Sequence, residues 1–246
     1  MEWRDEGLVI GVRRHGEHSA IVEAMTRDHG RHLGLVRGGR SARLGAALQP
    51  GNTLGLVWRA RLNEHLGAYA VEPLRLRAGR LMTSALALAG VNYLGALIRM
   101  LPERDPHAAV YEALSLIVDS LDDDALVPAL VARFEAQMLA ECGFRLDLER
   151  CAATGAADRL IYVSPKSARA VSAEAGAPWR DRLLPLPAFL RDGGRLKTRP
   201  SAAELADGFR LTGFFLARDL FAPSGAPLPD SRAAFLMAAA KAAPAA

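Results

Sequence analysis

Residues 8 to 72 alternate between short apolar runs and turn residues, a pattern that predicts β-strands rather than helices. Asp28-His29-Gly30 is typical of a tight hairpin turn, and glycine-rich or Pro-Gly sequences end further runs. The segment 41–48 starts with a serine suited to the N-cap position and predicts one or two helical turns. The pattern therefore predicts five strands, at residues 8–12, 19–26, 31–37, 53–62 and 67–71.

Five short strands with a small helix between the third and the fourth is the order expected of an OB barrel. Such barrels bind oligonucleotides on one face and in the loops at the rim. An SH3-like barrel has a similar strand count, and the count alone does not separate the two folds. Glu72-Pro73 is expected to stop the fifth strand, because proline cannot donate a hydrogen bond to a neighbouring strand.

From residue 81 onward the apolar positions recur at helical spacing. Asp122-Asp123-Asp124 is expected to cap the third helix, and Gly143 to end it. The periodicity is lost at 145–180, apart from a hairpin expected at 160–163 and 170–171. Helices are predicted at residues 81–101, 106–121, 125–142, 188–191, 201–221 and 231–242, followed by a frayed tail at 241–246.

Together these patterns predict an α+β protein of two domains. Residues 1–80 are expected to form a five-stranded OB-fold barrel, and residues 81–246 a mostly α-helical domain with an irregular insertion at about 145–182. With 246 residues, 50% of them hydrophobic and 24% charged, the chain can fold without a metal or disulfides. Its two cysteines, Cys142 and Cys151, exclude a disulfide-rich secreted scaffold.

The net charge of +4 is concentrated in the N-terminal third of the chain. Residues 1–80 hold 13 basic and 8 acidic residues, whereas residues 81–246 hold 18 and 19. This asymmetry points to a polyanion as the partner of the first domain. The N-terminus is charged and no apolar signal segment follows it, and polar residues interrupt the apolar run at 81–101. We therefore expect a cytoplasmic protein without membrane spans.

Motifs of the common enzyme classes are missing from the sequence. It contains no Gly-x-x-x-x-Gly-Lys-Ser/Thr loop, no His-Glu-x-x-His and no Gly-x-Ser-x-Gly. Glu17-His18-Ser19 has the residue types of a catalytic triad, but adjacency in sequence is not triad geometry. We therefore predict a protein that is not an enzyme and that needs no cofactor or metal.

The basic residues indicate where a polyanion binds. Arginine presents a forked set of donors that suits phosphate oxygens, and Gly38-Gly39 lets the backbone approach a phosphate closely. Trp58 either stacks on a base or packs inside the barrel, and strand alternation does not decide between the two. A solvated basic face without a ligand is the alternative. The candidate DNA-binding residues are Arg13, Arg14, Arg27, Arg37, Arg40, Arg43 and Arg59.

Several motifs, taken in order along the chain, resemble the RecO family of DNA repair proteins. The segment 7–31 resembles that family's first strand, Gly-Glu turn and second strand ending in Thr-Arg-x-x-Gly. Residues 36–41 resemble its Gly-Ala/Gly-Arg/Lys-Ser loop, and residues 48–51 its Leu-x-Pro-Gly entry to the fourth strand. Residues 134–151 resemble its Phe-Glu helix, which leads to a first zinc-binding cysteine.

The resemblance implies an OB-fold N-terminal domain, a helical C-terminal domain and binding to single- and double-stranded DNA. It also implies annealing of complementary strands and help in loading RecA onto strands coated by single-strand-binding protein, with RecR as a further partner. We expect the helical domain to dock the acidic, hydrophobic C-terminal tail of single-strand-binding protein, with Arg99 and Arg133 as candidate contacts. An OB-fold adaptor that binds only proteins is the alternative.

One departure from the family concerns metal. Many members carry a four-cysteine zinc finger in the irregular region. Here Cys151 is followed by Thr154, and the second pair of positions falls near Ser172 and Ala175. A single thiol does not provide the four ligands that structural zinc requires. We therefore expect a degenerate, metal-free hairpin that is held by packing around Tyr162.

Overall fold

The computed structural model describes residues 1–191 and 199–242. The chain forms two compact units, Met1–Asp122 and Asp123–Ala246. Residues 243–246, which make up most of the tail expected to be frayed, lie outside the described residues.

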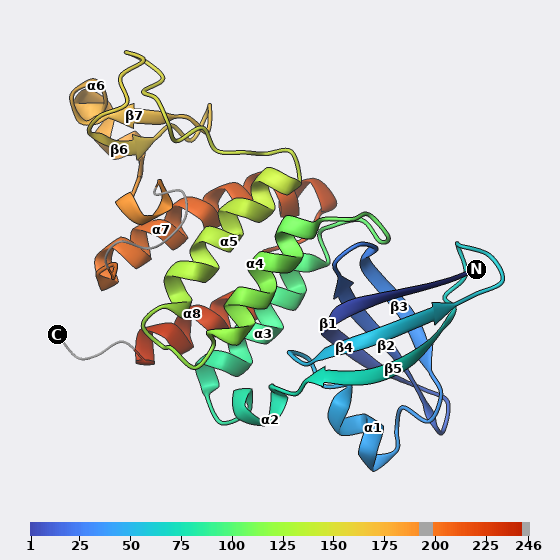
Figure 1. Cartoon of the computed structure of the whole chain (residues 1–246). Helices are drawn as coiled ribbons and strands as arrows, with labels where there is room; N and C mark the ends of the chain where they lie inside the picture. The colour runs from blue at the N-terminus through green and yellow to red at the C-terminus, as the bar shows by residue number, and fades with distance from the viewer. Residues whose placement is uncertain (192–198, 243–246) are drawn as a thin grey trace. The chain divides into compact units, whose positions relative to one another are not determined.

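Five strands of the first unit close into a barrel in the order β1-β2-β3-β5-β4 (Figure 1). Neighbouring strands are antiparallel except β3 and β5, which meet in parallel at Leu35 and Ala68. The five predicted strands and the helix between the third and fourth are therefore confirmed, and the arrangement is OB-like. The strands are β1 (Glu2–His15), β2 (Ser19–Thr26), β3 (Gly30–Val36), β4 (Thr53–Arg59) and β5 (Ala68–Arg75).

Two strands are longer than the sequence predicts. β1 begins at Glu2 rather than at residue 8, because its first residues pair with β4 and place Trp3 opposite Trp58. β5 continues to Arg75, so the stop expected at Pro73 is wrong. Beyond Ala68, β5 pairs with β4 alone, and Pro73 therefore removes no donor that a second neighbouring strand needs.

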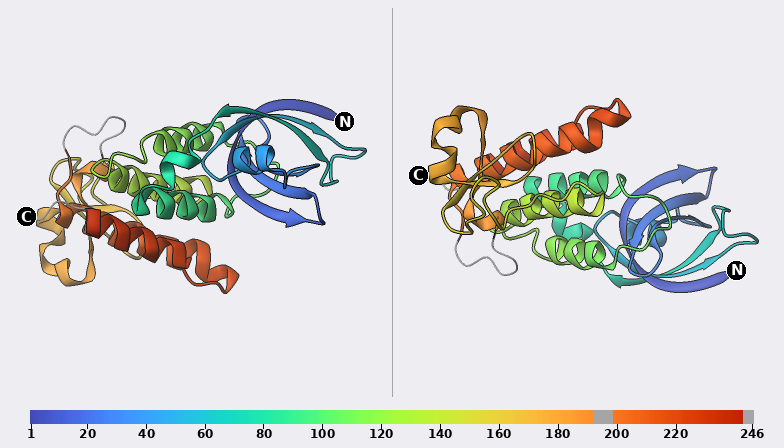
Figure 2. Two further views of the ribbon diagram at one scale, coloured as in Figure 1. Left: turned by 90° about the horizontal axis from the view of Figure 1, so that it is seen from below. Right: turned by 90° about the horizontal axis from the view of Figure 1, so that it is seen from above.

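Helix α1 (Ala42–Ala47) covers one end of the barrel, which the left view of Figure 2 shows. Ser41 caps this helix, since its hydroxyl oxygen accepts a hydrogen bond from the N–H of Leu44. Ala47 and Leu48 are buried and pack into the barrel core with the fully buried Trp58. The helix thus supplies the apolar surface that fills this end of the barrel.

Asn52 joins the chain segments that meet beside α1. Its amide nitrogen donates to the carbonyl oxygens of Ala46 and Ala47, at 3.1 and 2.9 Å. Its amide oxygen accepts from the N–H groups of Arg77 and Ala78, at 2.7 and 2.9 Å. Asn52 is only 1% exposed, so water cannot reach its amide, and these four hydrogen bonds satisfy its donors and acceptor instead. One side chain therefore fixes the end of α1, the entry to β4 and the chain that leaves β5.

Three helices follow the barrel in the first unit: α2 (Ala78–Leu81), α3 (Ala85–Ile98) and α4 (Ala108–Asp119). The single helix predicted at 81–101 is therefore wrong at its N-terminal end. Ser84 accepts a hydrogen bond from the N–H of Ala87 and is the N-cap of α3, which separates α3 from the short α2.

An arginine–carboxylate network joins α3 to the barrel. Glu23 on β2 accepts hydrogen bonds from Arg99, at the end of α3, and from Arg31 on β3, at 2.8 and 2.9 Å. Arg99 also donates to the carbonyl oxygen of Ile10 at 3.2 Å. A Cβ on Gly11 would lie 2.4 Å from the Arg99 guanidinium, so a larger residue here would displace that side chain.

The second unit combines helices with a three-stranded sheet in the order β7-β6-β8. The hairpin predicted at 160–163 and 170–171 and the helix predicted at 201–221 are confirmed, whereas the sequence pattern does not reveal β8. The elements are α5 (Val127–Glu141), β6 (Leu160–Val163), β7 (Ala170–Ser172), α6 (Ala173–Gly176), the 3-10 turn η1 (Ala177–Arg182), β8 (Leu184–Pro185), the 3-10 turn η2 (Ala188–Leu190), α7 (Ala202–Phe215), the π-helical turn η3 (Leu216–Phe221), the 3-10 turn η4 (Ala222–Ser224) and α8 (Asp230–Ala242).

A buried ion pair holds the long helices of the second unit together. Glu135 on α5 is 0% exposed and accepts hydrogen bonds from Arg232 on α8, at 2.8 Å, and from the hydroxyl of Thr212 on α7. Arg232 also donates to the carbonyl oxygen of Phe209 at 2.7 Å. A buried carboxylate needs such partners, because its desolvation would otherwise be unfavourable by several kcal/mol.

We predict that Asn52→Ala destabilises the first unit. The substitution removes the amide and leaves the carbonyls of Ala46 and Ala47 and two backbone N–H groups without their partner. The expected loss is about 2–4 kcal/mol in the free energy of unfolding, measured by urea denaturation. Asn92→Ala, at an exposed position of α3, is the control and should stay within about 0.5 kcal/mol of the wild type. Equal unfolding curves for Asn52→Ala and the wild type would contradict this role.

Candidate nucleic-acid interface

Five arginines lie at one end of the barrel, where the β1–β2 turn meets the loop between β3 and α1. The strand register explains why: Arg14 on β1 lies opposite Ala20 on β2, and Ala20 lies opposite Val36 on β3. The segment after β3 therefore starts next to the end of β1. We use the name basic rim for Arg13, Arg14, Arg37, Arg40 and Arg43, all of which are exposed.

Arg40 connects the two loops of the basic rim. Its Nη1 donates to the carbonyl oxygens of Gly16 and Glu17, at 3.1 and 2.7 Å. Its backbone N–H also donates to the carbonyl oxygen of His18, at 3.1 Å. Carbonyl oxygens satisfy these donors without cancelling the charge, so Arg40 both positions the loops and adds to their positive charge.

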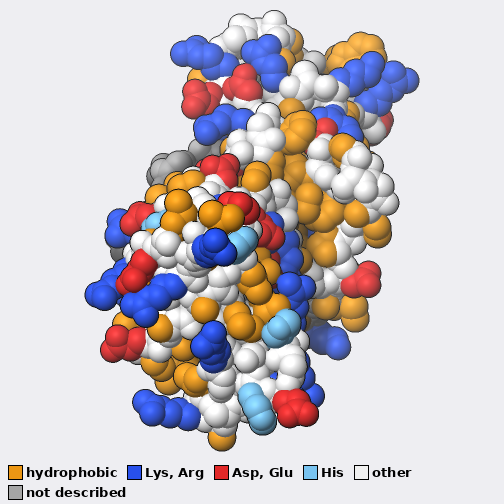
Figure 3. All heavy atoms as spheres, turned by 90° about the vertical axis from the view of Figure 1, so that its right-hand side faces the viewer, with side chains coloured by type: hydrophobic (Ala, Val, Ile, Leu, Met, Phe, Trp, Pro, Cys, Tyr) orange, Lys and Arg blue, Asp and Glu red, His pale blue; other side chains and the backbone are white. Residues whose placement is uncertain are grey.

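The remaining four arginines of the basic rim form no ion pair within the part of the chain that the structure describes. Glu17 is the one acid in the segments 13–18 and 37–43. Figure 3 shows basic side chains projecting from the barrel, in the lower part of the view. The basic rim is therefore an exposed, uncompensated positive surface, which attracts polyanions.

Arg27 and Arg59 lie away from the basic rim, at the opposite ends of their strands, and each faces a carboxylate. Arg59 donates to both oxygens of Glu2, at 2.9 and 3.1 Å. This paired hydrogen bond raises the pKa of Arg59 and lowers the pKa of Glu2. Arg27 forms an ion pair with Glu112 on α4 at 3.3 Å. The structure thus brings five of the candidate arginines together, and these two have counter-charges of their own.

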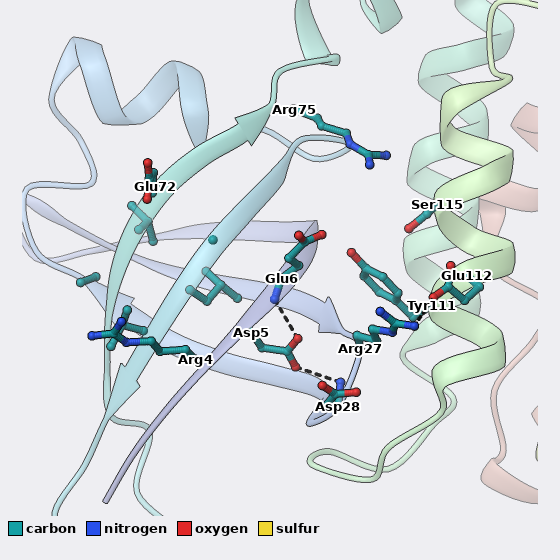
Figure 4. Close-up of a pocket in the computed structure, with 15 residues that line it drawn as sticks. Arg4, Asp5, Glu6, Arg27, Asp28, Glu72, Arg75, Tyr111, Glu112 and Ser115 are labelled. Carbon is teal, nitrogen blue, oxygen red and sulfur yellow. Dashed lines mark hydrogen bonds and ion pairs between the residues drawn. The ribbon is translucent and has the colours of Figure 1, made fainter.

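Arg27 also lines a cleft of about 810 Å³ between the outer face of β1, β4 and β5 and helix α4 (Figure 4). Tyr111 lies on the α4 side of this cleft. Burial, together with the nearby carboxylate of Glu6, raises the pKa of its hydroxyl, which therefore stays neutral. Acids outnumber bases among the charged lining residues, which are Arg4, Arg27, Arg75, Asp5, Glu6, Asp28, Glu72 and Glu112. An excess of carboxylates repels phosphate, so the cleft does not suit a nucleic acid.

Trp58 packs inside the barrel, which decides the alternative that strand alternation leaves open. It is 0% exposed, and its indole Nε1 donates to the carbonyl oxygen of Leu66 at 3.0 Å. The ring of Trp3 stacks on Trp58, with centroids 5.7 Å apart, and the ring of His29 stacks on Trp3 at 4.1 Å. Trp58 therefore has no free face for a base.

His32 belongs to the same aromatic cluster and faces the barrel interior. It is 2% exposed, and its Nδ1 lies 3.0 Å from the hydroxyl of Tyr69 and 2.9 Å from the carbonyl oxygen of Leu33. Burial, together with the positive charge of Arg104, lowers the pKa of His32 to about 4. The imidazole is therefore neutral at pH 7 and contributes no charge to the barrel.

The two candidate partner contacts belong to different units. Arg99 at the end of α3 is engaged with Glu23 and with the carbonyl oxygen of Ile10. Arg133 on α5 donates to the carbonyl oxygen of Phe189 at 2.8 Å and lines a groove of about 700 Å³. The groove combines apolar walls with a charged edge and is lined by Arg133, Ala136, Gln137, Ala140, Glu141, Arg145, Leu146, Leu148, Glu149, Leu190 and Arg191.

Residues at the expected zinc-ligand positions contact one another through hydrogen bonds. Cys151 is buried, and its sulfur lies 3.3 Å from the N–H of Ser172 and 3.5 Å from its hydroxyl. The N–H of Ala175 donates to the same hydroxyl at 3.4 Å. Among the described residues, no three His, Cys, Asp or Glu side chains form a group that could hold a metal ion.

None of the described helices is both long enough and apolar enough to cross a bilayer. The apolar stretch at 81–101 instead contains α3, from Ala85 to Ile98, and most of this helix is buried in the first unit.

Comparison with known proteins places the chain in a family. The family model for the Recombination protein O N terminal matches residues 1–77, and the model for the Recombination protein O C terminal matches residues 82–226. The chain belongs to the RecO family of DNA repair proteins. The two matched regions meet near residue 80, whereas the compact units divide after Asp122, because α3 and α4 pack against the barrel.

Curated relatives match the chain over nearly its whole length. The DNA repair protein RecO of Methylocella silvestris is 60% identical over 239 residues, which are 96% of this chain and 95% of that protein. Its counterpart from a strain of Methylorubrum extorquens is 58% identical over 240 residues, 96% of this chain and 97% of that protein. The Mesorhizobium japonicum protein is 58% identical over 238 residues, 97% and 93% of the two chains. RecO is not a known enzyme family, and membership supports a role in recombinational DNA repair.

We predict that His32 makes the stability of the fold depend on pH. Its pKa is about 4 in the folded chain, below the value of about 6.5 for free histidine, so the unfolded chain binds more protons between these values. The free energy of unfolding therefore falls as the pH falls from about 6.5 towards 4, by about 2 kcal/mol at pH 5 for one such group.

Urea denaturation at neutral pH and at about pH 5 measures this effect. His32→Gln retains a polar group for Tyr69 but does not titrate, so this variant should lose about 2 kcal/mol less than the wild type on acidification. His15→Gln, at an exposed position, is the matched control and should follow the wild type. The same pH dependence in all three proteins would show that His32 is not held neutral.

Proposed function

We propose that this chain is a DNA-binding recombination mediator. It binds single- and double-stranded DNA, anneals complementary strands and helps load RecA onto strands coated by single-strand-binding protein, in cooperation with RecR. The observation that carries the proposal is the basic rim, where four exposed arginines have no carboxylate partner in the described ranges and Arg40 adds a fifth charge. The activity needs neither catalytic residues nor a cofactor.

Guanidinium groups at the basic rim contact phosphates rather than bases. Arginine donors match the oxygens of a phosphate, which both DNA forms present at regular spacing. Binding is therefore independent of sequence, and it weakens as salt rises because each phosphate contact releases counterions.

Annealing follows from the same chemistry. Two complementary strands repel each other through their phosphates, and a local positive surface reduces that repulsion. The five arginines of the basic rim hold the backbones through phosphate contacts, and Trp58 is buried in the barrel and cannot reach the bases. The base edges therefore stay free to pair while the backbones are held.

We predict that Arg14→Gln with Arg37→Gln weakens binding to a poly-dT oligonucleotide. The pair removes two uncompensated charges and leaves the Arg40 contacts in place. The slope of log affinity against log salt should become shallower by about 1.4, the value for two contacts to a single strand, and affinity at low salt should fall about tenfold or more. Fluorescence anisotropy measures both, and annealing of strands coated by single-strand-binding protein should slow in parallel.

Arg27→Gln with Arg59→Gln is the matched control, because it removes two charges that already face Glu112 and Glu2. Its affinity and salt slope should stay close to those of the wild type. Equal losses in the two pairs would mean that DNA binding follows net charge and not the basic rim. A wild type without DNA binding at low salt would favour the adaptor that binds only proteins.

We also propose that the groove around Arg133 receives the C-terminal tail of single-strand-binding protein. That tail is acidic and hydrophobic, and the groove offers leucine and alanine walls beside Arg133, Arg145 and Arg191. Arg145 is exposed and has no ion partner in the described part of the chain. Arg99 lies in the other unit, engaged with Glu23, so Arg133 is the candidate contact that we retain.

We predict that Arg145→Ala weakens binding of a synthetic tail peptide roughly 10- to 150-fold, because a hydrogen bond to a charged group contributes roughly 1.5–3 kcal/mol. Isothermal titration calorimetry measures the affinity. Arg169→Ala, whose arginine is paired with Asp147 outside the groove, is the control and should bind like the wild type. Unchanged affinity in both variants, or unchanged binding after deletion of the tail from single-strand-binding protein, would refute this docking site.

We propose further that the insertion at 145–182 is a zinc-finger-like hairpin without its metal. Ser172 supports this view, because its N–H and hydroxyl contact the Cys151 sulfur where two thiolates would share a metal. Packing contributes as well: a Cβ on Gly176 would lie 2.5 Å from the ring of Tyr162, so helix α6 lies directly on that ring. Hydrogen bonds and packing thus take over the part that zinc plays in other members.

A further inference from the structure

The 3-10 turn η1 of the second unit presents a tryptophan to solvent. We use the name finger for residues 160–185, which span β6, β7, α6, η1 and β8. Trp179 in η1 is 56% exposed, whereas Trp58 is 0% exposed and Trp3 is half-buried. All six residues of η1, Ala177–Arg182, are exposed. A large aromatic ring in this position contributes little to the core, so its role lies at the surface.

The turn that carries Trp179 is anchored at its base. Gly176, which precedes η1, packs against the ring of Tyr162 so closely that a Cβ would lie 2.5 Å from it. Pro178 restricts the backbone within the turn. A tryptophan side chain has only two torsion angles, so it loses little conformational entropy when a planar group stacks on its ring.

The charges beside Trp179 are those of a phosphate-binding surface. The guanidinium of Arg182 lies 5.8 Å from the centre of the Trp179 ring. Arg180 approaches Asp181 only at 3.7 Å, and both side chains are largely exposed, at 74% and 92%, so water screens the pair. Figure 3 shows basic side chains beside exposed hydrophobic ones at the top of the view, where the finger lies.

The finger as a whole carries an excess of positive charge. It contains four basic residues and two acidic ones, and Arg159, just outside it, pairs with one of these acids, Glu174. Lys166 and Arg182 have no carboxylate partner among the described residues. An exposed aromatic ring between arginines on a positive surface is the combination that binds single-stranded nucleic acids, in which bases are free to stack.

We propose that Trp179 is a stacking platform for a base of single-stranded nucleic acid, with Arg180 and Arg182 at the adjoining phosphates. This inference rests on the proposed function and extends it, because the platform lies in the second unit and the basic rim in the first. One chain then has two separate surfaces for strands. Annealing needs two strands to be held at the same time, and two surfaces allow a single chain to do so.

The first experiment measures stacking directly. A poly-dT oligonucleotide should quench tryptophan fluorescence of the full chain, and Trp179→Phe should lack most of that quenching, since the other two tryptophans are buried or half-buried. Trp179→Ala should weaken binding to the oligonucleotide roughly 5- to 150-fold, the range that corresponds to one stacked base. Trp179→Phe should keep most of the affinity, because its ring still stacks.

Duplex DNA separates stacking from charge. The bases of a blunt duplex are already stacked and paired, so Trp179→Ala should leave its affinity for duplex DNA within about twofold of the wild type. Annealing of complementary oligonucleotides should slow in the same variant. Ile161→Ala, which removes an exposed apolar side chain from β6 of the same finger, is the control and should change none of these readouts.

The outcomes are distinct for the two proposals. A wild type that binds no DNA would overturn the proposed function itself. A wild type whose binding depends on Arg14 and Arg37 but is insensitive to Trp179→Ala, with equal quenching in Trp179→Phe, would overturn the stacking platform alone. Normal DNA binding by Trp179→Ala together with loss of binding to purified RecR or single-strand-binding protein would also overturn it, because the ring would then be a protein contact.

Discussion

A single buried amide, that of Asn52, fixes the end of the barrel on which the basic rim depends. Its four hydrogen bonds connect the last turn of α1, the entry to β4 and the chain that leaves β5. α1 in turn packs into the barrel directly after the loop that contains Arg37 and Arg40, and Arg40 itself holds this loop against the β1–β2 turn. Among the described residues, no side chain of the basic rim forms a hydrogen bond with Asn52, yet the amide fixes the helix that follows the loop of the rim.

Seven arginines of the barrel looked alike in sequence, and their surroundings divide them into two groups. The five of the basic rim lie where the loops contribute one acid, so their charge remains available. Arg27 and Arg59 lie at the other ends of their strands, where Glu112 and Glu2 face them. Affinity for a polyanion depends on uncompensated charge, so net charge alone would overestimate the binding surface.

Local patterns in the sequence were sufficient to predict most helices and strands. Pairing between distant segments accounts for the differences between the predicted and the observed elements. β2 runs from Ser19 to Thr26, the range that its apolar run and the flanking turn residues indicate, because both are local signals. The extension of β1 to Glu2 depends on β4, some fifty residues away, and has no local signal. The ion pairs of Arg27 and Arg59 and the burial of Trp58 also depend on distant segments and have no local signal in the sequence. The position of Trp179 likewise depends on how α6, which leads into η1, lies on Tyr162, which no spacing in the sequence reveals.

Phosphate contacts and base stacking make different demands, and the two units meet them separately. A surface that contacts only phosphates leaves base edges free. The basic rim is such a surface, because its arginines project from the end of β1, the loop after β3 and helix α1, while Trp58 is buried inside the barrel. A surface that stacks on a base distinguishes single strands from duplexes, because only unpaired bases expose their faces. Arginine serves both purposes, since its planar guanidinium forms paired hydrogen bonds with phosphate and lies flat beside an aromatic ring. A chain in which 28 of 31 basic residues are arginine is therefore suited to hold a strand by its backbone at one surface and by a base at another.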